Sequence, residues 1–570
     1  MRPASRPFLR AFGLLPIPCL ALFLLYPPSA LSQGAPAPGA HDLIQERQQK
    51  LLEGQQRRLE ELKRLPGPQT PPPARPGESG GCVNIQSIQL EGAERLPEAE
   101  RRALTAPYEG QCLEEGRLNA LLAGITQAYL SRGLITTRAY LPPQDASGGI
   151  LKVTVIEGRL EAIESSGIPS QREIAMSFPG KIGALLNVRE LEQMLDQLSR
   201  LPSRAATLDL LPGTEPGASK IQIKNAPQKP WRAGLRYDNS GIKSTGERQL
   251  GASFSWDSPL GLADQLNLAA GRDAVTEHWR RANNQSASYS LPWGWWTFSA
   301  SASRNSYQNL AETPGLTWKN SGDSHQYRAH AERLLFRDAS SKSSAAVGLN
   351  HMRANNYLED LWLEVSSYKL SELELSLSHG RRIHNSFVNL ELGWQRGIGA
   401  LNAQSRGHPR AGEPDAHYDK YTLTVSALAP FKIGAEDFSA ESVAFGQKSD
   451  AALYSAQRLG LGGLSSVRGF KDQTQYGNSG AYWRNQLRWR TSTGRIPQVT
   501  DTSVALLYDI GAIHGNKHQG EEAAHLSGAG IELTAQGKYL SASLTYAHTL
   551  TRPKSWKREH PVYFNVNLTY

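Results

Sequence analysis

Residues 562–570 read VYFNVNLTY, and this stretch decides the fold of the C-terminal part of the chain. Apolar or aromatic side chains occupy every second position from Val562 to Tyr570, and the positions between them are mostly polar. Because successive side chains of a β-strand point to opposite faces, this period of two predicts a strand with one apolar and one more polar face.

A second stretch, residues 481–490 with the sequence AYWRNQLRWR, repeats the pattern. Trp483, Leu487 and Trp489 share one face, while the opposite face carries Tyr, Gln and three Arg. Such a strand fits a barrel with an apolar exterior and a polar lumen. A soluble β-sandwich also alternates, with its apolar face inward, so the alternation alone does not choose between the two.

Segments of this kind recur from about Trp231 to the C-terminus, between turns rich in Gly, Asn, Asp and Pro. All twelve Trp lie at or after position 231, as expected for aromatic girdles at two membrane interfaces. An even number of strands is what single-chain bacterial barrels have. We therefore predict an all-β transmembrane barrel over 231–570, with sixteen antiparallel strands at 232–239, 247–256, 263–271, 283–291, 295–304, 326–336, 343–353, 365–377, 386–396, 419–429, 438–446, 481–490, 503–511, 526–535, 539–548 and 562–570.

The composition agrees with a barrel and excludes a bundle of transmembrane helices. Mean hydropathy is −0.46 and 39% of residues are hydrophobic, whereas each spanning helix needs about 20 consecutive apolar residues. The N-terminus has three early Arg, an apolar run over 11–26 and small residues near Ser32, which predicts a cleaved secretory signal over 1–32. A membrane anchor or a lipoprotein acylated at Cys19 is the alternative.

Charge and cysteine content point to an exported protein with no nucleic-acid partner. The formal charge of +9 falls to +6 without residues 1–32, which hold three Arg and no acid, and Lys and Arg are mixed with Asp and Glu throughout. Only Cys82 and Cys112 remain in the exported chain, and such a pair in an oxidising compartment predicts a disulfide. Cys112 is expected in the loop before a long helix.

Residues 43–64 predict a helix that is polar on nearly all sides. Taken alone, these residues favour a solvated spacer or a short coiled coil, and the alternative is a helix that occupies a polar, water-filled channel. Residues 65–81 are rich in Pro and Gly and predict an extended linker.

Between the linker and the barrel, the order strand, helix, helix, strand, strand occurs twice. The first copy spans 82–158, with strands that include 135–141 and 150–156, and the second spans 159–230. Two consecutive βααββ units are an internal repeat, which predicts two α+β domains.

Several motifs carry a family resemblance. Residues 459–470, LGLGGLSSVRGF, resemble the Val-Arg-Gly-Phe signature of two-partner secretion transporters, the haemolysin-secretion (TpsB) family of the outer-membrane assembly-factor superfamily. The polar N-terminal helix, the Pro-rich linker, two polypeptide-transport-associated (POTRA) domains, and the sequences YLSRGLITT (129–137), GLADQL (261–266) and YDIG (508–511) follow in the order of that family.

The resemblance implies how the site is built. The segment 450–479, between the eleventh and twelfth strands, is far longer than a usual hairpin, and in the family it folds into the barrel and sets its arginine against an acid of a late strand. The matching residues here are Val467, Arg468, Gly469 and Phe470 in the loop, and Asp509 with Tyr508 and Gly511 on the wall. The resemblance also implies that the N-terminal helix plugs the barrel.

The implied function is export of a specific large partner protein, a haemolysin, adhesin or contact-dependent toxin, which the POTRA domains bind unfolded. The implied location is the outer membrane, with the N-terminal domains in the periplasm, contact with membrane lipid, and insertion by the barrel-assembly machinery through the strand ending at Tyr570. No metal-ligand or nucleophile pattern is present, so we expect no catalytic residue, no cofactor and no enzyme activity. A porin and a barrel-assembly factor are the alternative functions.

Overall fold

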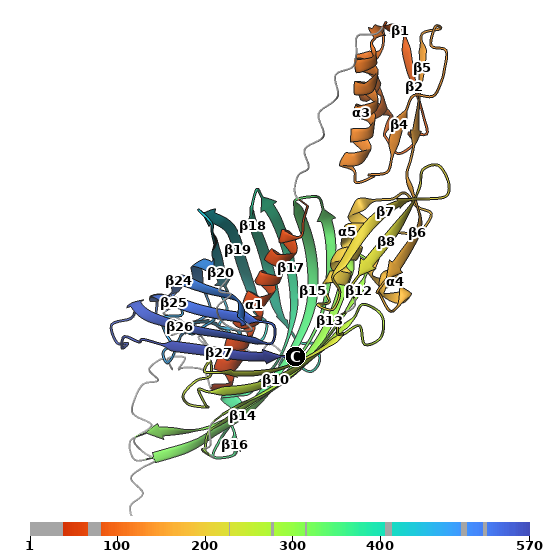
Figure 1. Ribbon diagram of the computed structural model, residues 1–570. Coiled ribbons are helices and arrows are strands. Elements are labelled where there is room, and N and C mark those ends of the chain that lie inside the picture. Colours follow the sequence, from red (N-terminus) through yellow and green to blue (C-terminus); the bar gives the residue numbers. More distant parts are fainter. Residues whose placement is uncertain are drawn as a thin grey trace, which may run out of the picture.

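The computed structural model describes residues 38–66, 81–226, 228–274, 277, 279–313, 316–404, 413–491, 499–516 and 521–570. A β-barrel with a helix inside it carries two small α/β domains at one end (Figure 1). The expected signal peptide, 1–32, lies outside the described residues, as does most of the expected linker at 65–81. None of the helices among the described residues combines the length and the apolar character that crossing a membrane requires.

The first α/β domain packs two small sheets against its helices. Its core gathers Ile85, Leu121, Ile125, Tyr129 and Val153. Strands β2, β5 and β4 form one sheet, and β1 pairs with β3. The elements are β1 Val83–Ile85, β2 Ser87–Glu91, α2 Glu98–Thr105, η1 Ala106–Tyr108, β3 Gln111–Leu113, α3 Glu115–Ser131, β4 Arg138–Tyr140 and β5 Ile150–Ile156.

Two details of this domain differ from the sequence prediction. Cys112 lies in the short strand β3, where its Cα pairs with Asn84, and not in a loop. Its disulfide with Cys82 joins Cα atoms 5.3 Å apart. The strand expected over 135–141 is limited to β4, because Leu134 packs in the first core while Ile135 turns into the core of the second domain.

The second α/β domain has a three-stranded sheet in the order β6-β8-β7. Side chains of Ser170 and Asn187 accept hydrogen bonds from the first turns of its two helices and so define where each begins. The elements are β6 Arg159–Ser166, α4 Gln171–Ser177, α5 Val188–Ser199, β7 Ala206–Pro212 and β8 Ala218–Asn225.

The sixteen-strand antiparallel barrel is confirmed, and each predicted segment corresponds to one wall strand. The wall consists of β9 Trp231–Asp238, β10 Gln249–Asp257, β11 Gln265–Asp273, β12 Arg281–Trp293, β13 Trp296–Thr313, β14 Leu316–Arg337, β15 Ser341–Leu358, β17 Tyr368–Ile383, β18 Ser386–Ile398, β19 Asp419–Ile433, β20 Glu436–Lys448, β23 Gly480–Thr491, β24 Val499–Ile513, β25 Ala524–Gly537, β26 Leu540–Thr551 and β27 Val562–Thr569. A further strand, β16 Leu361–Trp362, pairs only with the end of β15.

Strands β13 and β14 are longer than the predicted segments 295–304 and 326–336. Their ladder continues up to the pair Thr313–Leu316, and Figure 1 shows this hairpin projecting beyond the barrel wall. The added residues are mostly polar, as suits strand outside lipid, where one apolar face is no longer required. The period-two signal therefore ends before the strands do.

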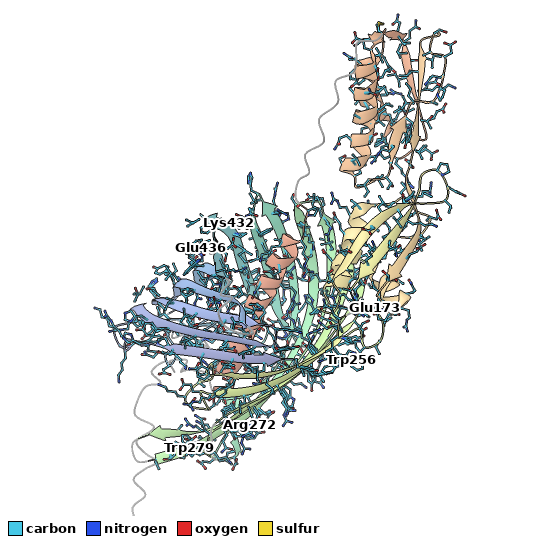
Figure 2. All side chains as sticks on the ribbon, in the orientation of Figure 1. Glu173, Trp256, Arg272, Trp279, Lys432 and Glu436 are labelled. Atoms are coloured by element: carbon cyan, nitrogen blue, oxygen red, sulfur yellow. A yellow bond between two sulfur atoms is a disulfide. The ribbon has the colours of Figure 1, made fainter. Side chains whose placement is uncertain are left out.

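The outer face carries the expected apolar and aromatic side chains. Trp483 and Trp489 are 47% and 38% exposed. Figure 2 shows Trp256 beside the second domain and Trp279 at the opposite end of the molecule. Aromatic side chains thus lie near both ends of the barrel, as in a membrane-spanning wall.

The second α/β domain is docked on the barrel through helix α5. Gln193 donates to the carbonyl oxygen of Gly294, and Arg200 donates to that of Ala263 at 2.6 Å. Asp196 forms an ion pair with Arg337 at 2.5 Å. Ala263 belongs to the sequence GLADQL, and its side chain is fully buried in the core of the second domain. The GLADQL sequence therefore forms a turn of the barrel, and this turn fixes the second domain to the barrel.

Candidate functional site in the barrel lumen

The connection between β20 and β23, residues 449–479, folds into the barrel. It contains η3 Ser455–Gln457 and a small hairpin of β21 Leu459–Leu461 and β22 Gln475–Gly477. Most of its side chains are buried, including the whole of β21. A loop that is buried over such a length must find polar partners for its backbone and its charges inside the barrel.

Arg468 lies at the tip of this inward loop and meets Asp509 on strand β24. Its Nε donates to Oδ2 at 2.7 Å, its Nη2 donates to Oδ1 at 2.6 Å, and its backbone N–H donates to Oδ2 at 3.0 Å. Nη1 also donates to Gln486, and Nη2 to the carbonyl oxygen of Asn485. The two side chains are 3% and 1% exposed.

This geometry satisfies both charges. A buried guanidinium without a carboxylate would be strongly destabilising, whereas the planar fork of Arg468 matches the two oxygens of Asp509. The arrangement fixes the tip of the loop in position and in orientation, because two parallel bonds between planar groups allow little rotation.

The neighbours of Arg468 pack closely against the wall. Val467 and Phe470 are fully buried in a cluster with Leu461 and other apolar side chains. Gly469 has no room for a side chain, because an added Cβ would lie 2.8 Å from the carbonyl oxygen of His548. The four residues Val467 to Phe470 therefore act as one packed unit.

The wall residues that the resemblance named do not all belong to this unit. Gly511 lies under the loop, where an added Cβ would contact Leu461 at 3.1 Å. Tyr508 is 49% exposed on the outer face and makes no contact with Arg468, so its inclusion as a wall partner is corrected. Since Asp509 points into the lumen, the period of two turns its neighbour outward.

A second buried ion pair holds the base of the inward loop, and the sequence analysis did not find it. Arg458 donates to Glu521 at 2.9 Å, and the backbone N–H of Asn478 donates to the same carboxylate oxygen at 3.0 Å. No recognisable motif surrounds either charge. The only sequence signal for this ion pair is that each long loop contains a charged residue of opposite sign to the other.

Helix α1, Pro38–Lys63, lies in the lumen against the inward loop (Figure 1). Arg47 donates to the carbonyl oxygen of Ala456 at 2.7 Å, and Gln48 donates to that of Gly460 at 2.8 Å. Ile44 is 1% exposed. The helix is therefore bonded to the loop through both backbone carbonyls and apolar packing.

The rest of helix α1 contacts the barrel wall. Gln55 is bonded to the side chains of Asn389 and Glu391 at 2.9 Å, and Arg58 pairs with Glu332 at 3.1 Å. At its C-terminal end, apolar side chains of the helix pack on the wall. The solvated-spacer interpretation, which the residues alone favoured, is wrong. A polar helix in a polar lumen has the same composition as a solvated one.

The described residues of the lumen form anchoring contacts between the helix, the inward loop and the wall. Within the described ranges, no group of three or more His, Cys, Asp or Glu side chains is arranged to hold a metal ion. What the arrangement can do is hold two obstructing segments, the helix and the loop, in a channel that would otherwise be wide.

Comparisons with known proteins agree on one family. The family description "Haemolysin secretion/activation protein ShlB/FhaC/HecB" matches residues 217–535, and POTRA domain descriptions match 83–158 and 159–212. The outer membrane transporter CdiB of Escherichia coli is 34% identical over 99% of this chain and 95% of its own. The hemolysin transporter protein ShlB of Serratia marcescens is 33% identical over 86% and 85%. The solved structure of CdiB from Escherichia coli superposes with a TM-score of 0.89 over 95% of this chain and 100% of that one.

Proposed function

Since this chain belongs to the haemolysin secretion/activation family, and is an outer-membrane transporter that exports a partner protein by two-partner secretion, we propose that its lumen holds a closed resting state. Helix α1 and the inward loop are the two closing elements, and α1 leaves when a partner arrives. The observation that carries the proposal is the bonding of α1 to both the loop and the wall.

The two elements have different strengths of attachment. The loop tip is held by a doubly bonded and buried ion pair. Helix α1 is held by side-chain amides, by hydrogen bonds from Arg47 to loop carbonyls, by apolar contacts and by partly exposed ion pairs, none of which joins two parallel bonds to one carboxylate. Exposed ion pairs contribute about 0–1 kcal/mol each. Helix α1 is therefore the element that is released first, and the loop stays in place as a guide along the inner wall.

The POTRA domains lie in the periplasm and bind the partner before it enters the lumen. Strand β7 offers a free edge of seven residues in the sheet β6-β8-β7, and Leu210 and Leu211 on it are 47% and 41% exposed. An unfolded segment can add there as a further strand, with backbone hydrogen bonds that do not depend on its sequence.

The partner is a large haemolysin, adhesin or contact-dependent toxin, and the transporter itself has no catalytic role. Folding of the partner outside the cell supplies the driving force. Insertion of the barrel proceeds through the barrel-assembly machinery, which recognises strand β27. Tyr570 follows this strand and bonds through its backbone with Ala233, across the seam where the barrel closes.

Co-expression tests these statements in cells. The transporter is expressed with the large secreted protein encoded beside it, and the culture medium is assayed for that protein. Export that requires the transporter, and that is lost when prolines are placed in β7, supports both the function and the POTRA edge. Export that persists with prolines in β7 contradicts binding at this edge and leaves the family function intact.

A further inference from the structure

The connection between β26 and β27, residues 552–561, is a strongly basic loop at the end of the barrel remote from the POTRA domains. It carries Arg552, Lys554, Lys557 and Arg558, and its one acid is Glu559. In the part of the chain that the structure describes, none of these four cationic groups forms an ion pair. Lys554, Lys557 and Arg558 are exposed.

The single acid of this basic loop, Glu559, faces the inward loop. The carboxylate of Glu559 accepts hydrogen bonds from the backbone N–H groups of Lys471 at 2.7 Å, Asp472 at 3.0 Å and Gln473 at 3.1 Å. The loop of ten residues therefore has a formal net charge of +3, from four cations and one carboxylate, and its cations repel one another unless an external anion lies among them.

The basic loop begins at the height where the apolar band of the wall ends. Leu540, Leu544, Tyr546 and Leu550 of β26 are each between 41% and 47% exposed. The ten residue-to-residue steps from Leu540 to Leu550 span roughly 33 Å along the strand, which is about 25 Å of height at the usual strand tilt and equals the height of the apolar band. Arg552 follows about 7 Å beyond Leu550 along the strand.

We propose that the basic loop 552–561 binds the phosphate groups of the glycolipid in the outer leaflet of the outer membrane. The proposal rests on the orientation given above, with the POTRA domains in the periplasm. Its chemistry is that of phosphate recognition, in which guanidinium groups offer paired donors and ammonium groups offer point charges. The exposed leucines beneath the loop would contact the acyl chains of the same lipid.

A bound lipid would also act on the inward loop, because the two loops are in contact. The ring of Trp556 packs edge-on against Phe470 with centroids 5.7 Å apart. Tyr563, just after the basic loop, donates from its hydroxyl to the carbonyl oxygen of Phe470 at 2.6 Å. Phosphate that neutralises the basic loop therefore steadies the segment that follows Arg468.

The test uses the full-length transporter, purified in detergent and mixed with bisphosphorylated lipid A, with native mass spectrometry as the readout. The variant replaces Arg552, Lys554, Lys557 and Arg558 by Ala, and Glu559 is kept. The control is K432A/K538A, which removes one cation from the end of β19 and one from the turn between β25 and β26, at the other end of the same barrel. We expect lipid retention to fall at least tenfold in the quadruple variant and to stay within twofold in the control.

Three further arms decide what is bound. Dephosphorylated lipid A should be retained at least tenfold less well than the bisphosphorylated lipid. Millimolar inorganic phosphate should not displace the bisphosphorylated lipid. Equal retention of both lipids, or equal retention by the quadruple variant, overturns the proposal. If inorganic phosphate by itself displaces the bound lipid, the proposal is also overturned, and the loop is assigned to soluble anions. Loss of export in the variant with lipid retention unchanged would assign the basic loop to the passing partner.

Discussion

Arg468 and Asp509 form a buried, doubly hydrogen-bonded ion pair that joins the inward loop to the barrel wall, 41 residues apart in the chain. The backbone N–H of Arg468 bonds to the same carboxylate. The acid therefore holds both the side chain and the main chain of the loop tip, so that its removal releases more than one interaction.

We predict that Arg468→Ala and Asp509→Ala each reduce export while the barrel still inserts. Either change leaves one buried charge unpaired, which costs about 3–5 kcal/mol in a dry site and less where water enters the lumen. Arg468→Lys should also impair export, because an ammonium group cannot form the two parallel bonds. Export of the co-expressed partner and protease cleavage within 450–479 are the measurements.

A double-mutant cycle then isolates the pair from its surroundings. Tyr508→Leu is the matched control, since Tyr508 is the neighbour of Asp509 on the lipid-facing side and should leave the loop protected. Single effects that simply add, together with a loop already open to protease in the unaltered protein, would be incompatible with an anchored inward loop.

The strands of the barrel could be predicted because the wall imposes a period of two. Residues 562–570 show this directly: Val562 and Leu568 are 46% and 51% exposed, while Tyr563 is 4% exposed in the lumen. The same rule would have placed Tyr508 outside once Asp509 was assigned to the lumen. The ends of β13 and β14 could not be predicted, because a strand outside the membrane is free of this constraint.

The interior of the barrel was less accessible to sequence reasoning. The polar surface of helix α1 suits bulk water and a polar lumen equally, so only a family resemblance separated the two. Arg468 was found because a motif surrounds it, whereas Arg458 and Glu521 form a comparable pair with no motif. Long-range pairs between single charges leave no periodic trace in the sequence.

The disulfide between Cys82 and Cys112 gives a prediction for the first POTRA domain. It closes a loop of 30 residues, for which the chain-entropy relation gives about 3–4 kcal/mol of stabilisation. C82S/C112S should lower the midpoint of thermal unfolding of this domain and leave the barrel inserted. Mass spectrometry of the unreduced protein should find no free thiol, and two free thiols would refute the bond.

Docking of the second POTRA domain on the barrel should weaken in acid. Burial alone would raise the pKa of Asp196, but Lys342 and Arg337 outweigh it and hold the pKa below its usual value. A carboxyl group whose pKa is lowered by docking stabilises the docked state above its ordinary pKa of about 4 and loses that contribution as the pH falls below it.

The measurement is a fluorescence distance between a label on the second POTRA domain and one on the barrel, followed from pH 7 to pH 3. We expect separation to begin below about pH 4. Asp196→Asn should raise the separated fraction at pH 7, because Lys342 then loses this carboxylate and Arg337 keeps only Glu192. Glu215→Gln, at a turn of the same domain, is the control and should behave as the unaltered protein. A pH profile that Asp196→Asn does not change would assign the transition to other groups.

Removal of helix α1 should open the channel without preventing export. Deletion of residues 38–63 leaves the inward loop anchored by Asp509 and Glu521, so the channel gains conductance while the barrel stays intact. Weakening the helix contacts through Gln48→Ala and Arg58→Ala should give more frequent openings of the same size, since the helix then leaves the lumen more often. Lys50→Ala is the control, because the Lys50 side chain is 53% exposed and bonds only within the helix. Single-channel recording in a planar bilayer distinguishes these cases. If the deletion variant conducts no more than the unaltered protein, the inward loop alone closes the channel, and α1 has no gating role.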